Sequence, residues 1–330
     1  MVPGLVGTLY SLLVQIDLVA AEGSVVFRAP VALFVYNRPD HTRQTVEALA
    51  ANTLAVETPL YVFSDAPTDE TPRQPVEEVR SYIRTISGFQ SVTLIERPIN
   101  YGLARSIIDG VTGLCETYGC VIVVEDDLVT SSRFLSYMND ALTAYEHDAR
   151  VMQISGHIAH VPEFSRRTEA LFVPFVTSWG WGTWERAWKQ FDPSAQGWEK
   201  IRDDRTLRKR FNLDDHFDYA TMMQMQLDGK IDSWAIRWYL SVFSRGGMAL
   251  FPPRSLVRNI GFASGTHGSR VLRWTLARQP ISDEPVSFPR LRQVVDHDYA
   301  LVKKALFRQT GGQLGAMFRW ARRYLASGTG

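Results

Sequence analysis

The sequence predicts an α/β fold built on a mainly parallel, doubly wound sheet. Short apolar runs return between residues 25 and 148 with a spacing of about 30 residues, which is the length of a strand–helix–strand unit. Segments with helical periodicity separate these runs, and such alternation is typical of α/β proteins. A hydrophobic content of 45% and a charged content of 22% agree with a chain that buries a substantial core.

Four apolar runs are predicted to be the strands of this sheet. Each is short, rich in β-branched residues and uninterrupted by polar ones, as expected for strands buried on both faces. The predicted strands are Val31–Tyr36, Leu60–Phe63, Val92–Ile95 and Val121–Val124.

Four segments between and after the strands are predicted helices. The third stops at Gly119, a residue suited to a helix C-terminus, and the second begins with Pro75 followed by two acids, which suits an N-terminus. The predicted helices are Asp40–Ala51, Pro75–Ile86, Leu103–Tyr118 and Ser131–Tyr145.

Polar residues follow every one of the predicted strands. Ligands of doubly wound sheets bind beyond the carboxyl ends of the strands, so these side chains are expected to meet around one ligand. A single polar residue in such a loop is usually structural, and it is their convergence on one edge that indicates a site. The candidates are Asn37, Arg38, Asp65, Asn100, Arg105, Glu125, Asp126 and Asp127.

The acidic triplet Glu125-Asp126-Asp127 follows its strand with no intervening turn. Carboxylates at a strand end suit Mg²⁺ or Mn²⁺, which also bind phosphate oxygens, so the triplet predicts a metal–diphosphate site. Nucleotidyltransferases and phosphatases use carboxylates in the same way, and a solvated charge run is the ordinary alternative. The chain has neither a P-loop nor a GxGxxG motif, which disfavours kinases and dehydrogenases.

The second half of the chain is rich in tryptophan. Trp184 and Trp188 have helical spacing and are expected in the core. Trp179 and Trp181 lie in a predicted glycine-rich loop, where an indole can stack on a sugar ring, although core packing is the alternative. These two and Trp234 are candidate acceptor contacts.

Asp232 stands just before the predicted helix Trp234–Phe243. It could cap that helix, or it could act as a general base that accepts a proton from an attacking hydroxyl. The residues alone leave both roles open, and the two are compatible.

Composition limits the class of partner and the compartment. The formal net charge of +1 disfavours a broad nucleic-acid-binding face. Cys115 and Cys120 match no metal motif and are expected to be reduced and buried in a cytoplasmic protein. The apolar start, Met1–Ile16, lacks the basic residues of a signal peptide and is short for a membrane span. An amphipathic pattern over 310–330 fits either peripheral membrane contact or packing on the domain.

Several motifs in order resemble bacterial sugar transferases of the GT-A fold, family 2-like, and more distantly the N-acetylglucosaminyltransferase I family. The resemblance covers about residues 28 to 270. The segments that carry it are Val31–Pro39, Asn100–Ala104, Val124–Leu128, Ser178–Trp184, Lys230–Trp238, Arg258–Phe262 and Thr266–Gly268.

The resemblance implies an inverting, metal-dependent transfer of a hexosyl or N-acetylhexosaminyl group from a nucleotide sugar, often a UDP-sugar, to a glycan or lipid-linked hydroxyl in polysaccharide assembly. It makes Asp127 the Mn²⁺ or Mg²⁺ ligand of a DXD-like motif, and Asp232 the catalytic base. Glu125 and Asp126 would hold the ribose or donor sugar.

The remaining implied roles concern the nucleotide and a closing loop. Asp65 would face the base, Asn37 and Arg38 would lie near the diphosphate, and Asn100 and Arg105 beside the nucleotide. His267 would belong to a loop that closes over the donor. The N-acetylglucosaminyltransferase I enzymes carry two acids where this chain has Asp232-Ser233, so their acceptor preference is not expected here.

The expected organisation is a nucleotide-sugar half (25–150), a fused acceptor-binding half (151–270) and a helical C-terminal extension (271–330). Two other functions compete with a transferase. A sugar nucleotidyltransferase should carry a glycine-rich phosphate loop after the first strand, where this chain has Asn37-Arg38-Pro39. An inactive carbohydrate-binding or scaffold protein would not need the intact triplet.

Overall fold

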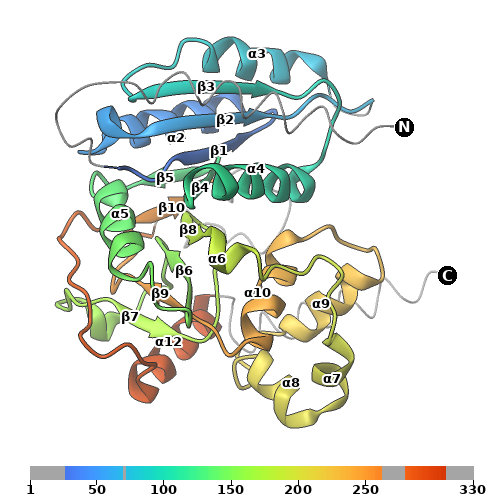
Figure 1. Ribbon diagram of the computed structural model, residues 1–330, viewed down its shortest axis with the longest axis vertical. Coiled ribbons are helices and arrows are strands. Elements are labelled where there is room, and N and C mark those ends of the chain that lie inside the picture. Colours follow the sequence, from blue (N-terminus) through green and yellow to red (C-terminus); the bar gives the residue numbers. More distant parts are fainter. Residues whose placement is uncertain (1–26, 70–71, 262–278, 310–330) are drawn as a thin grey trace.

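The computed structural model describes residues 27–69, 72–261 and 279–309, and shows a single large sheet flanked by helices (Figure 1). The sheet has eight strands in the order β3-β2-β1-β4-β8-β6-β9-β7. The strands are β1 (Val31–Val35), β2 (Pro59–Ser64), β3 (Ser91–Glu96), β4 (Cys120–Glu125), β6 (Val151–Ser155), β7 (Leu171–Val173), β8 (Trp181–Trp184) and β9 (Met248–Phe251). A separate antiparallel pair joins β5 (Leu128–Thr130) to β10 (Val257–Asn259).

The predicted α/β fold with a mainly parallel sheet is confirmed. Four strand pairs are parallel, namely β1–β2, β2–β3, β1–β4 and β6–β9. Three are antiparallel, all of them involving β8 or β7. The sheet therefore continues from the first half of the chain into the second without a break.

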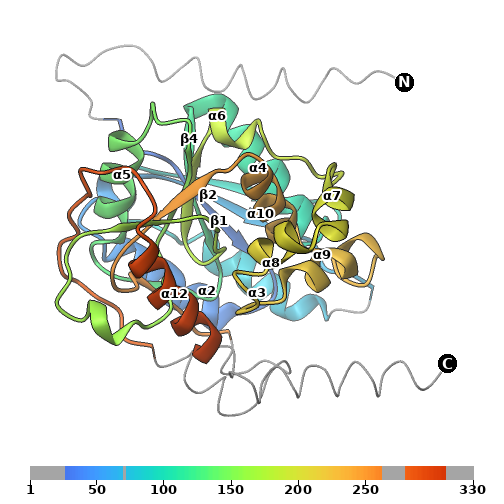
Figure 2. The same ribbon diagram turned by 90° about the horizontal axis from the view of Figure 1, so that it is seen from below.

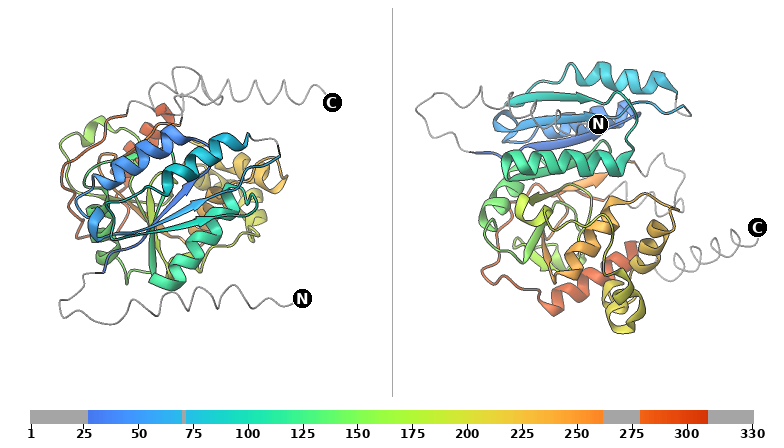
Figure 3. Two further views of the ribbon diagram at one scale, coloured as in Figure 1. Left: turned by 90° about the horizontal axis from the view of Figure 1, so that it is seen from above. Right: turned by 45° about the vertical axis from the view of Figure 1, so that its right-hand side comes forward.

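The four predicted strands and four predicted helices of the first half are all present. Helices α2 (Pro39–Ala50) and α3 (Arg73–Ile83) lie on one face of β1–β3, and α4 (Leu103–Tyr118) lies on the other (Figure 3). This arrangement on both faces is the doubly wound pattern. Helix α4 ends as expected at Gly119, whose φ of 77° is the left-handed conformation that glycine adopts at no steric cost.

The second half adds a helical cluster and the edge of the sheet. Helices α7, α8, α9 and α10 gather at one end of the molecule (Figures 1 and 2), and α12 packs near β7. The bounds are α5 (Phe134–Ala144), α6 (Glu185–Trp188), α7 (Trp198–Asp203), α8 (Arg205–Phe211), α9 (Tyr219–Leu227), α10 (Trp234–Ser244) and α12 (Asp296–Gln309).

One local prediction in this half is wrong, and one of the two open alternatives for Asp232 is excluded. Trp181 does not lie in a loop but begins β8, which pairs with β4 and β6 on either side. Asp232 does not cap α10, because Ser233 is the N-cap and its hydroxyl accepts from the backbone N–H of Ile236. Helix α10 begins at Trp234, one residue later than it would if Asp232 were its N-cap.

The core explains the abundance of tryptophan. Trp181 stacks on Trp234 with ring centroids 5.0 Å apart, and Trp188 lies 5.8 Å from Trp181 and 5.1 Å from Trp238. Trp184 is buried as well, as expected for a core residue. Cys115 and Cys120 are free and buried, which confirms the expectation for both, and burial raises the pKa of each thiol.

Candidate active site

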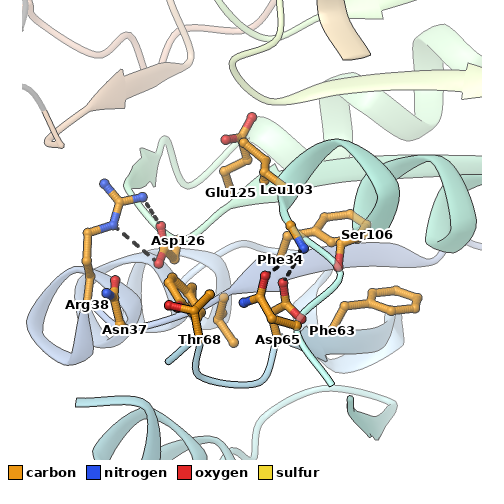
Figure 4. A pocket seen from close by; sticks show the side chains of 14 residues that line it. Phe34, Asn37, Arg38, Phe63, Asp65, Thr68, Leu103, Ser106, Glu125 and Asp126 are labelled. Atoms are coloured by element: carbon orange, nitrogen blue, oxygen red, sulfur yellow. Dashed lines mark hydrogen bonds and ion pairs between the residues drawn. The ribbon is translucent and has the colours of Figure 1, made fainter. Parts of the chain in front are cut away.

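The carboxyl ends of the parallel strands surround a cavity of about 430 Å³, a size within the range of small-ligand sites. Figure 4 shows Arg38 and Asp126 at one end of this cavity and Asp65, Phe63 and Ser106 at the other. Six of the predicted site residues line it: Asn37, Arg38, Asp65, Asn100, Glu125 and Asp126.

The acidic triplet forms one charged group with Arg38. Glu125 is the last residue of β4, while Asp126 and Asp127 follow it. The Arg38 guanidinium makes an ion pair with Asp126, and its Nη1 lies 3.0 Å from Oδ2 of Asp127. Asn259 of β10 donates its side-chain amide to the other Asp127 oxygen at 3.2 Å. The two aspartates are thus held in fixed orientations by side chains from two other segments, the N-cap of α2 and strand β10.

The triplet carries more negative charge than Arg38 compensates. Burial and the two neighbouring carboxylates raise the pKa of Glu125 to about 8. Burial likewise raises the pKa of Asp126 to about 6, although Arg38 acts in the opposite direction. A bound cation would relieve this repulsion, because an opposite charge favours the ionised form of each carboxyl group.

Gly261 lets the backbone lie close to the Asp127 carboxylate and to Arg38. A Cβ at that position would lie 2.2 Å from Oδ2 of Asp127 and 2.9 Å from Nη1 of Arg38. Two hydrogen bonds fix the backbone there: Ile260 N–H donates to the Asp127 carbonyl, and Gly261 N–H donates to the side-chain oxygen of Asn259. The donor set therefore fits an oxygen-loving divalent cation that takes one or two protein carboxylates and completes its shell from a ligand's phosphates. Among the described residues, no three His, Cys, Asp or Glu side chains form a complete protein cage.

Asp65 shapes the cavity wall through its own backbone contacts. Its Oδ1 accepts from the N–H groups of Ala66 and Tyr101, and its Oδ2 accepts from Gly102 N, at 2.8–2.9 Å. Asn100 donates to the Ala66 carbonyl at 2.6 Å. The carboxylate retains little free capacity to accept from a ligand, so its main observed contribution is to tie the loop after β2 to the loop after β3.

Arg105 lies outside the cavity lining. Its guanidinium stacks over the Tyr101 ring at 3.9 Å, and Arg97 approaches the same ring at 4.4 Å. The arginine is exposed and belongs to the rim rather than to the wall.

Sequence reasoning missed the apolar floor of the cavity. Phe34 and Phe63 stack at 4.9 Å with an angle of 13° between their planes. Gly110 in α4 makes room for them, since a Cβ there would lie 2.9–3.0 Å from both rings. A glycine inside an otherwise regular helix is destabilising, and that was the available signal for a close contact.

The predicted acceptor contacts divide into two groups. Trp181 is 0% exposed and Trp234 is 3% exposed, so neither ring is open to a ligand, and the expectation for both is corrected. They lie in the core because β8 is an inner strand and α10 packs against it. Trp179 is half-buried and precedes Gly180 at the start of β8.

Asp232 and His267 complete the set of predicted residues. The Asp232 side chain is 66% exposed, and its Oδ1 lies 3.0 Å from Nη2 of Arg237. Its carboxylate is accessible to an incoming hydroxyl, as a general base must be. His267 and the expected membrane-binding segment 310–330 lie outside the described residues. None of the helices in the described ranges is long and apolar enough to cross a bilayer.

A sheet whose parallel strands present acidic and basic side chains around one cavity is typical of α/β proteins that bind a small ligand at the carboxyl ends of the strands. The chain belongs to glycosyl transferase family 2, whose model matches residues 31–228. It is therefore a glycosyltransferase, and the GT-A fold that the sequence resemblance implied is confirmed.

The chain is also similar to several solved structures, all at low identity. One is the mannosyltransferase PcManGT from Pyrobaculum calidifontis, in complex with GDP-Man and Mn²⁺ (13% identity, 73% of this chain and 81% of that chain, TM-score 0.39). Another is TarS 1-349 of S. aureus (10% identity, 77% and 70%, TM-score 0.38). A third is the galactosyltransferase LgtC with donor and acceptor sugar analogues (8% identity, 84% and 95%, TM-score 0.35). A comparison with curated proteins gave no match.

Proposed function

We propose that the protein is a metal-dependent, inverting glycosyltransferase that moves a hexosyl or N-acetylhexosaminyl group from a nucleotide sugar, most simply a UDP-sugar, to a hydroxyl of a glycan or lipid-linked acceptor. One observation carries the proposal: in a family 2 chain, Arg38 and the triplet Glu125-Asp126-Asp127 meet at the edge of a 430 Å³ cavity. Charge of both signs beside an apolar floor suits a ligand with a diphosphate at one end and a planar base at the other.

The donor would lie along the cavity. Its base would enter between the Phe34–Phe63 floor and the wall formed by Asp65 and Asn100. Its diphosphate would reach the end at which Arg38 offers a planar, permanently charged donor group, which suits phosphate oxygens. The half-exposed guanidinium needs only to exchange its contact with the aspartates for one with the ligand.

Asp127, supported by Asp126, would hold Mn²⁺ or Mg²⁺ in the space beside Gly261. The cation supplies Lewis-acid neutralisation of the charge on the departing diphosphate. Asn259 and Arg38 fix the orientation of the Asp127 carboxylate. Glu125, with its raised pKa, is placed to hydrogen-bond a hydroxyl of the ribose or the donor sugar.

The transfer itself is a direct displacement. The acceptor hydroxyl oxygen forms a bond to the anomeric carbon, and the bond from that carbon to the phosphate oxygen breaks, with its electron pair leaving on the nucleoside diphosphate. Asp232 accepts the hydroxyl proton. Attack from the face opposite the leaving group inverts the anomeric configuration. Arg237 lies close enough to orient the base, and positioned general-base catalysis contributes about 10²–10⁴ in rate.

Two other functions fit less well. A sugar nucleotidyltransferase should bind phosphates in a glycine-rich loop after β1, whereas here Asn37 and Arg38 lead directly into α2. An inactive carbohydrate-binding protein would have no need for a triplet whose carboxyl groups repel one another.

Release of nucleotide from a panel of UDP-, GDP- and dTDP-sugars, with Mn²⁺ and with chelator, tests the proposal. We expect slow metal-dependent release of nucleoside diphosphate from one nucleotide family in the absence of acceptor. Release of pyrophosphate or sugar phosphate would indicate the nucleotidyltransferase. Binding without any release, with or without saccharide acceptors, would favour the inactive protein.

The place of action is part of the proposal. We propose a cytoplasmic enzyme that contacts the inner face of a membrane when its acceptor is lipid-linked, on the basis of the amphipathic pattern of 310–330. Flotation with anionic liposomes, with and without residues 310–330, tests this contact. Equal flotation of both forms would contradict a role for this segment.

A further inference from the structure

A second cavity, of about 330 Å³, lies at the same edge of the sheet as the proposed donor site. Strands β4 and β6 both run antiparallel to β8 between them, and β9 runs parallel to β6, so the carboxyl ends of β4, β6 and β9 lie at one edge. The loop after β6 contributes residues 158–161 to the lining, and the loop after β9 contributes 253–255. A third wall comes from residues 279–284.

Strand β10 connects this second cavity to the acidic triplet. Ser255 lines the cavity, and the chain then runs through β10 to Asn259, whose side-chain amide donates to Asp127 at 3.2 Å. Four residues of chain span at most roughly 14 Å. The second cavity and the proposed donor site are therefore neighbours.

The walls of the second cavity are joined by hydrogen bonds. The side-chain amide of Gln279 donates to the Ile158 carbonyl at 2.6 Å, and Ser282 N–H donates to the Ser255 carbonyl at 2.9 Å. These two bonds connect the third wall to both of the loops that follow strands. The cavity is therefore formed before any ligand arrives, as a binding site requires.

Three side chains of the lining keep hydrogen-bonding capacity for a ligand. Arg254 donates from Nη1 to the Ser165 carbonyl at 3.2 Å, and within the described part of the chain it forms no ion pair. His160 and Glu284 are exposed, and no residue of the described ranges hydrogen-bonds to either side chain. Guanidinium, imidazole and carboxylate together offer both donors and acceptors.

The charges of the lining favour a neutral, hydroxyl-rich ligand. The lining contains Arg254 together with the acids Asp283 and Glu284, so neither a phosphate nor an ammonium group would find a charge of one sign. A sugar has hydroxyl groups that can accept from Arg254 and donate to Glu284. Its C–H faces can pack on apolar side chains of the lining such as Ile158 and Ile281.

We propose that the second cavity binds one sugar unit of a saccharide acceptor, with sugar hydroxyls accepting from Arg254 and donating to Glu284. The inference rests on the proposed function, because the neighbouring donor site makes a saccharide the ligand that the cavity would meet. The acceptor is then recognised by its glycan part rather than by a lipid alone. These side chains bind the acceptor and do not take the transferred proton, which goes to Asp232.

Two matched pairs of variants separate binding from a structural role. Arg254→Met removes the guanidinium and keeps an apolar stem, and Arg166→Met makes the same change at an exposed arginine outside the lining. Glu284→Ala removes the exposed carboxylate of the lining, and Glu163→Ala is its control at an exposed glutamate outside it. Thermal melting checks that each variant is folded.

Saturation-transfer NMR detects saccharide binding without requiring turnover. The probes are cellobiose, lactose, maltose and chitobiose, each with UDP and Mn²⁺ in the same sample. We expect at least one disaccharide to bind the wild-type protein, and to bind Arg254→Met and Glu284→Ala about tenfold more weakly, as expected for the loss of a hydrogen bond to a charged group. Arg166→Met and Glu163→Ala should bind like the wild type.

Weaker binding in either lining variant, with both controls unaffected, supports the proposal. Wild-type protein that binds none of the disaccharides would overturn it, and so would unchanged binding in both lining variants or equal weakening in the controls.

The nucleotide signals in the same samples report separately on the proposed function. Their absence with UDP, and then with GDP and dTDP in its place, would remove the donor site. Disaccharide binding that depends on Arg254 would in that case still establish the second cavity as a sugar site.

Discussion

The ends of the parallel strands and the start of helix α10 hold their polar groups in different ways. At the ends of β1 to β4, carboxylates are fixed by backbone amides, by Arg38 and by each other: Asp65 accepts three backbone N–H groups and Asp126 pairs with Arg38. Just before α10, the Asp232 side chain is 66% exposed and forms an ion pair with Arg237. The comparison shows a rigid group of polar residues at the proposed donor site and a mostly exposed carboxylate at the proposed catalytic base.

The largest expected effect is on the transfer rate and tests the exposed carboxylate of Asp232. Asp232→Asn should lower the transfer rate about 10²–10⁴-fold, because the acceptor hydroxyl loses its base, while nucleotide affinity stays unchanged. Steady-state kinetics and nucleotide titration measure the two quantities. Asp228→Asn is the matched control, since Asp228 is a nearby acid paired with Lys230. Near-normal transfer by Asp232→Asn would show that the base lies elsewhere.

The next effect concerns the tryptophans. Trp181→Ala should lower the free energy of unfolding by about 3–5 kcal/mol, because it leaves a large cavity in the core. Trp179→Ala should cost much less stability, since its indole is half-buried. Denaturant unfolding of both variants gives the comparison. Equal losses would contradict the division of these residues between core and surface.

A third effect tests the rigidity of the donor edge. Gly261→Ala should weaken metal-dependent nucleotide binding about tenfold, since its Cβ would displace Asp127 or Arg38, and that factor corresponds to roughly 1.4 kcal/mol. Isothermal titration measures the affinity. Gly113→Ala is the control, because a Cβ there meets open space on α4 and should leave nucleotide binding unchanged. Wild-type affinity in Gly261→Ala would mean that the space beside Asp127 is not used.

The last effects concern the pH dependence of stability, in which Glu125 and His157 have opposite signs. The folded-state pKa of Glu125 is raised from 4.5 to about 8, so metal-free protein should lose stability as pH rises through that window. The folded-state pKa of His157 is lowered from 6.5 to about 3, so stability should fall as pH drops below 6.5.

Melting curves of chelator-treated protein between pH 4.5 and 8.5 test both signs. Glu125→Gln should flatten the alkaline side of the profile, and His157→Asn should flatten the acid side. A profile unchanged by either substitution would contradict the burial of that group.

The first half of the chain, which contains the proposed donor site, could be predicted from the sequence because its signals are local. A strand buried on both faces reads as an apolar run, and Asp65 or Glu125 directly after such a run must lie at the sheet edge. The burial of the tryptophans in the second half could not be predicted in the same way. Trp181 is fully buried and Trp179 only half-buried because β8, which begins at Trp181, inserts between β4 and β6. The burial of His157 gave no signal either, because Ser255, its hydrogen-bond partner, is 98 residues away in the sequence.

Thermal melting with nucleotides is the most direct test of the central claim that Arg38 and the triplet form a metal-dependent nucleotide-sugar site. The screen compares UDP, GDP, dTDP and their sugars, with Mn²⁺ and with chelator, for the wild-type protein and Asp127→Ala. We predict a metal-dependent stabilisation by one nucleotide family, worth about 2.7 kcal/mol at a ligand concentration one hundred times Kd, and its loss in the variant. Folded wild-type protein that no nucleotide stabilises would contradict the account.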